Sequence, residues 1–318
     1  MDLFLSIFPI VLLIYLMVKR NAFPSYVALP LIAGLVYLLQ MFYFKNEFVL
    51  LNANIVSAII SVFTPISVIF GAVFFNRMME ASGAMNTLRQ WLGNISPNPV
   101  AQLMIIGWAF AFMLEGASGF GTPVAIAAPI LVGLGFKPMP VVMLALVMNS
   151  VPVSFGAVGT PTWYGFKTLL DSGTINGDDV SRIGQITALI HFIAGFVIPV
   201  LALRFIVSWK EIKQNALFIL ISILSCTVPY FLIAQFNYEF PSLVGGAIGL
   251  FISVLVAGKG IGLSKTAEVQ EKQSIPGSTL IKAFTPTLLL IVILIITRVK
   301  QLPLKVMLND ATEWFQFS

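Results

Sequence analysis

Long apolar segments separated by short polar connectors make up most of the chain. About 20 apolar residues in a helix are enough to cross the ~30 Å hydrocarbon core of a bilayer. The first such segment runs from Leu3 to Val18, and the later ones have similar lengths. We expect further membrane-spanning helices at Phe23 to Phe44, Val56 to Phe75, Ile183 to Val207, Ala216 to Phe236, Pro241 to Ala257 and Ala283 to Thr297. The pattern therefore predicts an all-α polytopic membrane protein.

The first segment has the length of a secretory signal peptide but lacks its other features. The chain begins Met1-Asp2, so no basic region precedes the apolar run. Lys19-Arg20 follows the run instead, and no small-residue cleavage site comes after it. We therefore expect residues 1–22 to form a first transmembrane segment.

Two apolar regions between Val100 and Pro161 are interrupted by polar residues, glycines and prolines. The first interruption reads Leu114-Glu115-Gly116-Ala117-Ser118-Gly119-Phe120-Gly121-Thr122-Pro123, and the second runs from Asn149 to Pro161. Glycine permits unusual backbone turns and proline removes a backbone donor, so both regions predict broken helices. Backbone groups left unpaired at membrane depth need shielding by protein or by a water-filled cavity. Paired broken helices, with their positive N-terminal ends, are typical of anion sites in secondary transporters.

The basic residues favour a re-entrant hairpin over a single span for residues 100–136. A single span would divide the 18 Lys and Arg residues equally between the two sides of the membrane, whereas a segment that returns to its side of entry gives twelve and six. The positive-inside rule prefers the uneven split. In addition, the 37 residues would make a helix ~55 Å long, which is too long for one crossing. We therefore predict a helical hairpin over 100–136, entered from the cytoplasm, and an interrupted helix over 139–163.

Composition and charge exclude several classes of protein. The chain is 58% hydrophobic and 10% charged, with a mean hydropathy of +0.96, far from the roughly 25% charged residues of soluble domains. The net charge is +5, but the basic residues are scattered at segment ends, which is not typical of nucleic-acid binding. The one cysteine, Cys226, lies in an apolar run, and neither a metal-ligand spacing nor a dinucleotide fingerprint is present. We therefore expect no catalytic residues, no cofactor, no metal site and no nucleic-acid partner, and a lipid bilayer around the protein.

Two short sequence matches indicate an internal repeat. One pair is Phe23-Pro24-Ser25-Tyr26-Val27 and Phe240-Pro241-Ser242-Leu243-Val244, and the other is Phe63-Thr64-Pro65 and Phe284-Thr285-Pro286. On the topology above, the two copies start in opposite orientations, which defines an inverted-topology repeat.

The repeat divides the chain into unequal parts. We expect residues 23–215 to form a first transporter repeat and residues 216–318 to form the start of a second, truncated one. The counterpart of the hairpin would lie near position 336, beyond Ser318. The expectation is therefore a fragment that lacks half of its binding site.

Two long motifs cover the interrupted regions. They are Leu114-Glu115-Gly116-Ala117-Ser118-Gly119-Phe120-Gly121-Thr122-Pro123-Val124-Ala125-Ile126, continuing to Leu131-Val132-Gly133-Leu134-Gly135-Phe136-Lys137-Pro138, and Asn149-Ser150-Val151-Pro152-Val153-Ser154-Phe155-Gly156-Ala157-Val158-Gly159. Both closely resemble motifs of the bacterial L-lactate permease family, and weaker matches extend to Glu313-Trp314. The resemblance implies uptake of L-lactate, and often glycolate, together with protons across the bacterial inner membrane, by a carboxylate transporter with inverted repeats.

The chain also differs from the pattern of that family. Known members look substantially longer and continue with a second polar hairpin and a second broken helix, so the resemblance implies a missing C-terminal half as a partner. The family commonly has Ala before the proline of the hairpin tip, where this chain has Thr122. A hydroxyl at this position could alter the contacts with substrate.

Glu115 is the candidate for proton coupling. A carboxylate in an apolar segment costs roughly 2.5 to 3.5 kcal/mol on insertion scales, so its presence indicates a function. It could carry the coupled proton, or it could be a structural acceptor that holds the N–H groups of the glycine-rich tip.

The other candidates are contacts of a small hydroxy acid. The resemblance points to the residues of the tip and of the second interruption, namely Gly116, Ser118, Gly119, Gly121, Thr122, Asn149, Ser150 and Ser154. The alternatives are a tightly packed turn in which glycine only allows close helix approach, and a capped helix break that never touches ligand. His191 could join a proton path, but a solitary histidine is more often a packing residue.

Three functions remain open from the sequence. The first is a lactate and proton symporter, or a part of one, in which one repeat rocks against a scaffold. The second is a membrane fragment or assembly subunit without transport activity. The third is a channel, in which the broken helices would line a continuous pore.

Overall fold

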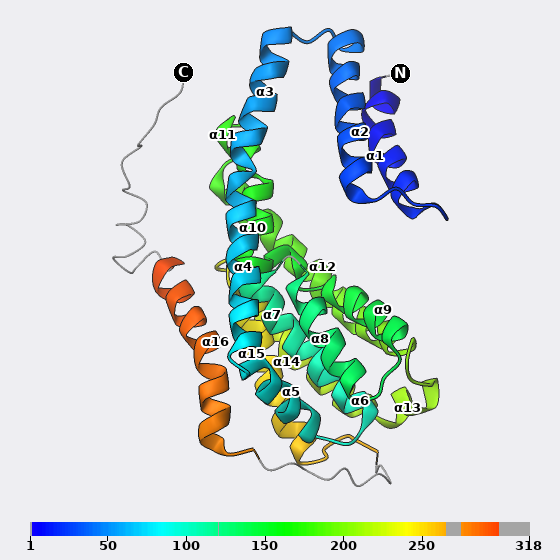
Figure 1. Cartoon of the computed structure of the whole chain (residues 1–318), viewed down its shortest axis with the longest axis vertical. Coiled ribbons are helices and arrows are strands. Elements are labelled where there is room, and N and C mark those ends of the chain that lie inside the picture. Colours follow the sequence, from blue (N-terminus) through cyan, green and yellow to red (C-terminus); the bar gives the residue numbers. More distant parts are fainter. Residues whose placement is uncertain (1, 120, 265–274, 299–318) are drawn as a thin grey trace. The chain divides into compact units, whose positions relative to one another are not determined.

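The computed structural model describes residues 2–119, 121–264 and 275–298, and every regular element in these ranges is a helix (Figure 1). Phe120 of the predicted tip, part of the connector after Gly258, and the end of the chain from residue 299 lie outside the described residues. The chain forms two compact units, residues 1–68 and residues 69–318. Each unit is described by itself.

The first unit consists of apolar helices with mostly exposed side chains. It contains α1 (Asp2–Val18), α2 (Ser25–Leu38) with its π-helical continuation η1 (Leu39–Tyr43), and α3 (Phe48–Ser61). Helix α1 packs against α2, and the Tyr43 hydroxyl donates a hydrogen bond of 2.8 Å to the Asp2 carboxylate. Helices of this length with many exposed apolar side chains suit a lipid environment.

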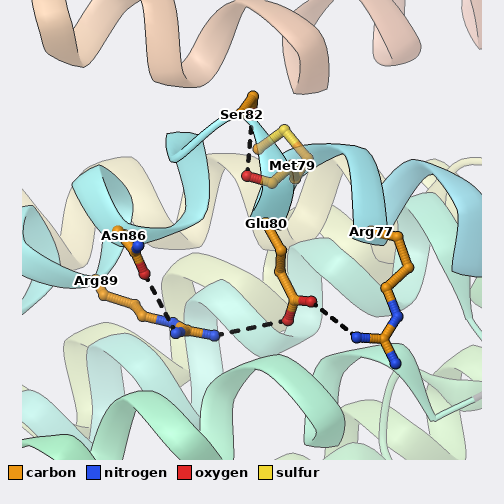
Figure 2. A network of polar contacts seen from close by, with 6 residues as sticks. All are labelled: Arg77, Met79, Glu80, Ser82, Asn86 and Arg89. Atoms are coloured by element: carbon orange, nitrogen blue, oxygen red, sulfur yellow. Dashed lines mark hydrogen bonds and ion pairs between the residues drawn. The ribbon is translucent and has the colours of Figure 1, made fainter.

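A salt-bridge network fixes the corner between α4 (Phe63–Ala81) and α5 (Ala84–Asn94). Glu80 lies between two arginines (Figure 2): its Oε2 is 3.2 Å from Arg77, and its Oε1 is 3.8 Å from Arg89. Ser82 closes the turn, because its hydroxyl donates to the Met79 carbonyl at 3.1 Å. This corner orients the inner face of both helices, which carries Met79, Met85 and Leu88.

The buried centre of the second unit is one helix of 20 residues, Pro99–Ser118, made of α6 (Pro99–Gln102), the π-helical η2 (Leu103–Phe110) and α7 (Ala111–Ser118). In its most apolar 18-residue window, 94% of the residues are buried. Asn98 caps its start by accepting from the N–H groups of Val100 and Ala101. The Asn98 amide also donates to Asn215, 3.0 Å away, so the start of this helix is tied to the start of α14.

The central helix ends in a tight turn and the chain then folds back. Gly119 and Gly121 have φ of 59° and 78°, a left-handed conformation that glycine adopts without steric cost. Helix α8 (Thr122–Gly133) follows and packs against α7 and η2. The predicted arms of a hairpin are thus two helices that lie against each other, the second being much shorter than the first.

A sharp bend separates α9 (Pro138–Asn149) from the next two helices, η3 (Val153–Phe155) and α10 (Gly156–Gly165), at an angle of 66°. This bend lies inside the interrupted helix predicted over residues 139–163. Ala157, Val158 and Gly159 are consecutive residues with positive φ. A β-branched residue in this conformation is a clear outlier, and such strain costs of order 1–3 kcal/mol per residue. The short α11 (Lys167–Asp171) follows.

Long helices surround the hairpin and the broken helix. They are α12 (Gly177–Leu203), α14 (Ala216–Ala234), α15 (Pro241–Gly258) and α16 (Gly277–Arg298), with the short α13 (Trp209–Gln214) as a connector. Helices α14 and α15 form a closely packed pair, and α15 also packs on α7. A methyl group at Gly116 would collide with the Leu243 backbone, and one at Gly246 with the Met113 backbone. Glycine therefore lets α7 and α15 approach closely.

Six helices among the described residues are long and apolar enough to cross a membrane, and the bent pair Pro138–Gly165 would be a seventh. They include Ser25–Tyr43, Gly177–Leu203, Ala216–Ala234 and Pro241–Gly258, close to the predicted spans. The span predicted from about Val56 to Phe75 lies within the apolar helical stretch Phe48–Ala81, which is longer at both ends. Pro65 does not break this stretch, since it stands in the first turn of α4, where its missing N–H has no partner to lose.

Candidate functional site

Glu115 lies where the hairpin meets the broken helix. It is on the last turn of α7 and only 1% of its surface is exposed. Its Oε2 accepts a hydrogen bond of 3.2 Å from the amide of Asn149, the last residue of α9. Its Oε1 lies against Gly156, the first residue of α10, so closely that a side chain at Gly156 would collide with it. The carboxyl group thus touches both halves of the broken helix.

The Asn149 amide has hydrogen-bonding capacity left over. Its Nδ2 donates to Glu115, while its Oδ1 is buried without a partner among the described residues. An amide carries two donors on one end and an acceptor on the other. By turning over, Asn149 can donate to a carboxylate or accept from a carboxylic acid, so it suits both protonation forms of Glu115.

The backbone of the tip packs directly on the break. A methyl group at Gly119 would come within 2.8 Å of the Ala157 Cβ. On the other side of the break, a methyl group at Gly159 would come within 2.7 Å of the Tyr238 carbonyl oxygen. Small residues therefore let three segments meet: the hairpin tip, the break, and the connector between α14 and α15.

Side chains of the surrounding helices donate hydrogen bonds to two carbonyl groups at the break. The Tyr230 hydroxyl on α14 donates to the Val151 carbonyl at 3.3 Å, and the Ser242 hydroxyl on α15 donates to the Pro152 carbonyl at 2.6 Å. Nδ1 of His191 on α12 lies 2.7 Å from the Tyr230 hydroxyl. The break is therefore held in place by α14 and α15, and His191 supports one of these contacts.

The residues predicted from the sequence do not all converge on Glu115. Asn149 contacts it and Gly119 lies beside it on the tip, but Gly116 packs against α15. The Ser150 hydroxyl donates to Val147 of its own helix at 2.7 Å, and the Ser154 carbonyl accepts from Thr162 at 2.7 Å.

Ser118 and Thr122 face a different space, a narrow cavity beside the tip. Helices α4, α5 and α16 also contribute to its walls. The volume open to a water molecule is ≈ 20 Å³, which is room for about one water. Its lining is mainly apolar and includes four polar residues, Asn76, Ser118, Thr122 and Thr287. The Ser118 hydroxyl donates to the Leu114 carbonyl of its own helix at 2.9 Å. Asn76 and Thr287 were missed by the sequence reasoning, although an asparagine in a membrane helix is a signal for function.

No group of three or more His, Cys, Asp or Glu side chains that could hold a metal ion is found in the part of the chain that the structure describes. The described polar groups at the tip and the break are one carboxyl group, amides, hydroxyls and backbone groups. Such a set can bind a small polar molecule and move one proton.

The apolar helices and the buried polar contact at a broken helix define a polytopic membrane protein. The chain belongs to the L-lactate permease family, whose family model matches residues 2–317. It is 65% identical to the "Putative L-lactate permease" of Haemophilus influenzae, over 98% of this chain and 58% of that protein. It is also 28% identical to the L-lactate permease of Escherichia coli, over 78% of this chain and 44% of that protein.

Another relative is named for a different substrate. The glycolate permease of Escherichia coli is 35% identical over 46% of this chain and 25% of that protein. The chain spans about half the length of the curated relatives it matches. No solved structure matches the chain.

Proposed function

We propose that this chain takes part in the uptake of L-lactate, and of glycolate, together with protons across the bacterial inner membrane. The family and the permease names of its relatives support the transported class, a small monocarboxylate. The site at the hairpin tip supports the mechanism. In this proposal the two helices Pro99–Ser118 and Thr122–Gly133 are a re-entrant hairpin, and residues 23–215 and 216–318 belong to two inverted repeats.

The contact between Glu115 and Asn149 carries the proposal. Burial of a charge is costly unless it is paired, and no described Lys, Arg or His forms a salt bridge with Glu115. A proton is then the remaining means of neutralising this carboxyl group. Because Asn149 can hydrogen-bond to either form, Glu115 can take up a proton on one side of the membrane and release it on the other.

The substrate would be bound by the tip and the break. The positive N-terminal end of α8 attracts a carboxylate, and Ser118 and Thr122 lie next to it among the residues that line the cavity. Asn149, Ser150 and Ser154 at the break remain proposed contacts, as do Gly116, Gly119 and Gly121 of the tip. Alternating access would follow from movement of the hairpin and broken helix against α12, α14 and α15.

Uptake of radiolabelled L-lactate tests the proposal. The 318-residue chain is expressed in cells that lack lactate uptake, alone and together with the remaining length of the Haemophilus influenzae relative. Saturable uptake that increases with an inward proton gradient, in either arrangement, supports the proposal. Uptake that does not saturate indicates a channel, and no uptake in either arrangement indicates a membrane protein without transport activity; both results contradict it.

A further inference from the structure

The Tyr230 hydroxyl on α14 has two partners on different parts of the molecule. It donates to the Val151 carbonyl of the break at 3.3 Å, and Nδ1 of His191 on α12 lies 2.7 Å from it. Tyr230 has 0% of its surface exposed, so its hydroxyl group has no access to bulk water. Its ring packs against Phe112 of α7 and Phe155 of η3, with ring centroids 5.5 and 5.3 Å away. The hydroxyl group is therefore held between these two partners.

The number of protons fixes the directions of the two hydrogen bonds. A tyrosine hydroxyl has one proton to donate, and a carbonyl oxygen can only accept. When Tyr230 donates to Val151, Nδ1 of His191 must carry a proton and donate to the Tyr230 oxygen. If Nδ1 has no proton, it accepts from Tyr230 instead, and the Val151 carbonyl loses this donor. Histidine suits both arrangements, because its neutral ring can carry the proton on either nitrogen.

These bonds do not form a proton path to Glu115. The series of bonds from His191 through Tyr230 ends on the Val151 carbonyl oxygen, which has no proton to pass on. Glu115 has its hydrogen bond with Asn149 instead. His191 therefore acts on the break through Tyr230, and not on the coupled proton.

His191 and Tyr230 belong to two helices that pack against each other, α12 and α14, whereas Val151 belongs to the break. In the proposed alternating access, the broken helix moves against these helices. The two side chains then stay together while the Val151 carbonyl moves away. A buried hydroxyl left without an acceptor is costly, so Nδ1 of His191, as a second acceptor, favours release of the break.

The surroundings of His191 leave Tyr230 in control of its proton. The titratable groups on α12 and on the elements packed against it, α9, α10, α14 and the connector before α15, are Asp178, Asp179, Arg182, Tyr164, Cys226, Tyr230, Tyr238 and Glu239. The charged residues on α12 itself lie near its start, more than two turns from His191. The connector meets α12 at Gly184, two turns before His191. In the described part of the chain, the hydrogen-bond partner of His191 is Tyr230.

We propose that His191 is a positioning residue for the break, which acts through the proton on Nδ1. With the proton on Nδ1, His191 donates to Tyr230, and Tyr230 holds the Val151 carbonyl. With the proton on Nε2 instead, Nδ1 accepts from Tyr230 and the carbonyl is released. The proton that leaves Nδ1 goes to water and a proton from water is added at Nε2, so the ring stays neutral. This role rests on the proposed transport function, in which the break moves.

The position of the proton can be measured without transport. The chain has a single histidine, so NMR of protein labelled with 13C,15N-histidine observes His191 alone. At about pH 8, where a histidine ring is ordinarily neutral, we expect Nδ1 of the unaltered protein in lipid bilayers to carry the proton and Nε2 to be bare. In Tyr230→Phe the proton should no longer be confined to Nδ1. A bare Nδ1 in the unaltered protein without substrate overturns the arrangement.

Exchange of labelled for unlabelled L-lactate tests the role in transport, in the arrangement of chains that takes up lactate. His191→Leu removes the second acceptor but leaves Tyr230 free to hold the break. We expect exchange to be about tenfold slower, as for one lost hydrogen bond, with a nearly unchanged melting temperature. His191→Asn keeps a donor and an acceptor close to the position of Nδ1, so exchange should stay within about twofold of the unaltered protein. Thr187→Val, one turn earlier on α12, is the control and should change neither measurement.

The possible results separate this role from mere structural support. Support alone predicts the opposite pattern for His191→Leu, a lower melting temperature with normal exchange, and that result overturns the proposal. Equal exchange by the Leu and Asn variants overturns it as well. If the unaltered protein exchanges lactate but Nδ1 is bare, the role of His191 is wrong while the proposed function stands. No exchange by the unaltered protein in either arrangement of chains overturns both.

Discussion

Oε2 of Glu115 accepts a hydrogen bond from Nδ2 of Asn149 across 3.2 Å, and this one contact joins the end of α7 to the end of α9. Glu115 lies in the last turn of α7 and Asn149 is the last residue of α9, so the contact lies where two helices end.

Replacement of Asn149 should weaken the fold at this junction. Asn149→Leu keeps the approximate size but removes the side-chain amide that donates to Glu115. A hydrogen bond to a charged group contributes about 1.5–3 kcal/mol in water-soluble proteins, and interhelical bonds in membranes average ~0.6 kcal/mol. We expect a loss of unfolding free energy within these limits, measured by thermal denaturation in detergent. Asn86→Leu, at an exposed position, is the control, and equal losses for both variants would contradict the account.

The two hydroxyls that donate to the break should contribute unequally to its stability. Tyr230→Phe removes the side-chain donor to the Val151 carbonyl, and a buried acceptor left unpaired costs about 1–3 kcal/mol. Ser242→Ala removes one of two donors to the Pro152 carbonyl, which still accepts from the Phe155 N–H at 3.2 Å, so a smaller loss of about 0.5–1.5 kcal/mol is expected. We expect a lower melting temperature and faster labelling of a cysteine placed at Ser150. Tyr26→Phe, which alters a tyrosine that is 78% exposed, should change neither measurement.

Glycine is required where α7 crosses α15. Gly116→Ala and Gly246→Ala place a methyl group against the backbone of the opposite helix, which must move. Overpacking of this kind costs typically 1–3 kcal/mol, so less folded protein is expected in membranes for either variant. Gly71→Ala in α4 has no neighbour within 4 Å and should be neutral or slightly stabilising, because alanine favours helix. Normal levels of the Gly116→Ala protein would show that the helices are not this close.

The sequence predicted the spans and the two interruptions well, because apolar length and glycine or proline content determine them locally. The span Ala216 to Phe236 and the helix Ala216–Ala234 differ only at one end. The same local patterns do not show which residues face each other. The substrate contact of Gly116 stays a prediction, while its close packing on Leu243 was not predicted. Asn76 was missed because its place beside the tip depends on how α4 packs. His191 was set aside, yet Tyr230, 39 positions later, is its partner.

The hydrogen bonds that cap the start of helix α13 should make the melting temperature of the protein depend on pH. The Ser208 hydroxyl donates to the Glu211 carboxylate at 2.6 Å, and the Ser208 N–H donates to it at 2.7 Å. Both bonds lower the pKa of Glu211, the hydroxyl bond more than the N–H bond. A lowered pKa in the folded state means that this stabilisation is present at neutral pH and is lost as the pH falls through the folded-state pKa. Ser208→Ala should therefore lower the melting temperature at pH 7, and the difference from the unaltered protein should shrink below about pH 4. A difference that is constant with pH would contradict this assignment.

Glu115→Gln is the sharpest test of whether Glu115 carries the coupled proton, because glutamine keeps the size and hydrogen-bonding capacity of the side chain but cannot exchange a proton. The measurement compares two modes of L-lactate transport in the same membranes: accumulation driven by an inward proton gradient, and exchange of labelled for unlabelled lactate without a gradient. We expect Glu115→Gln to abolish accumulation while exchange continues. Proton-driven accumulation at the level of the unaltered protein would show that Glu115 does not carry the coupled proton.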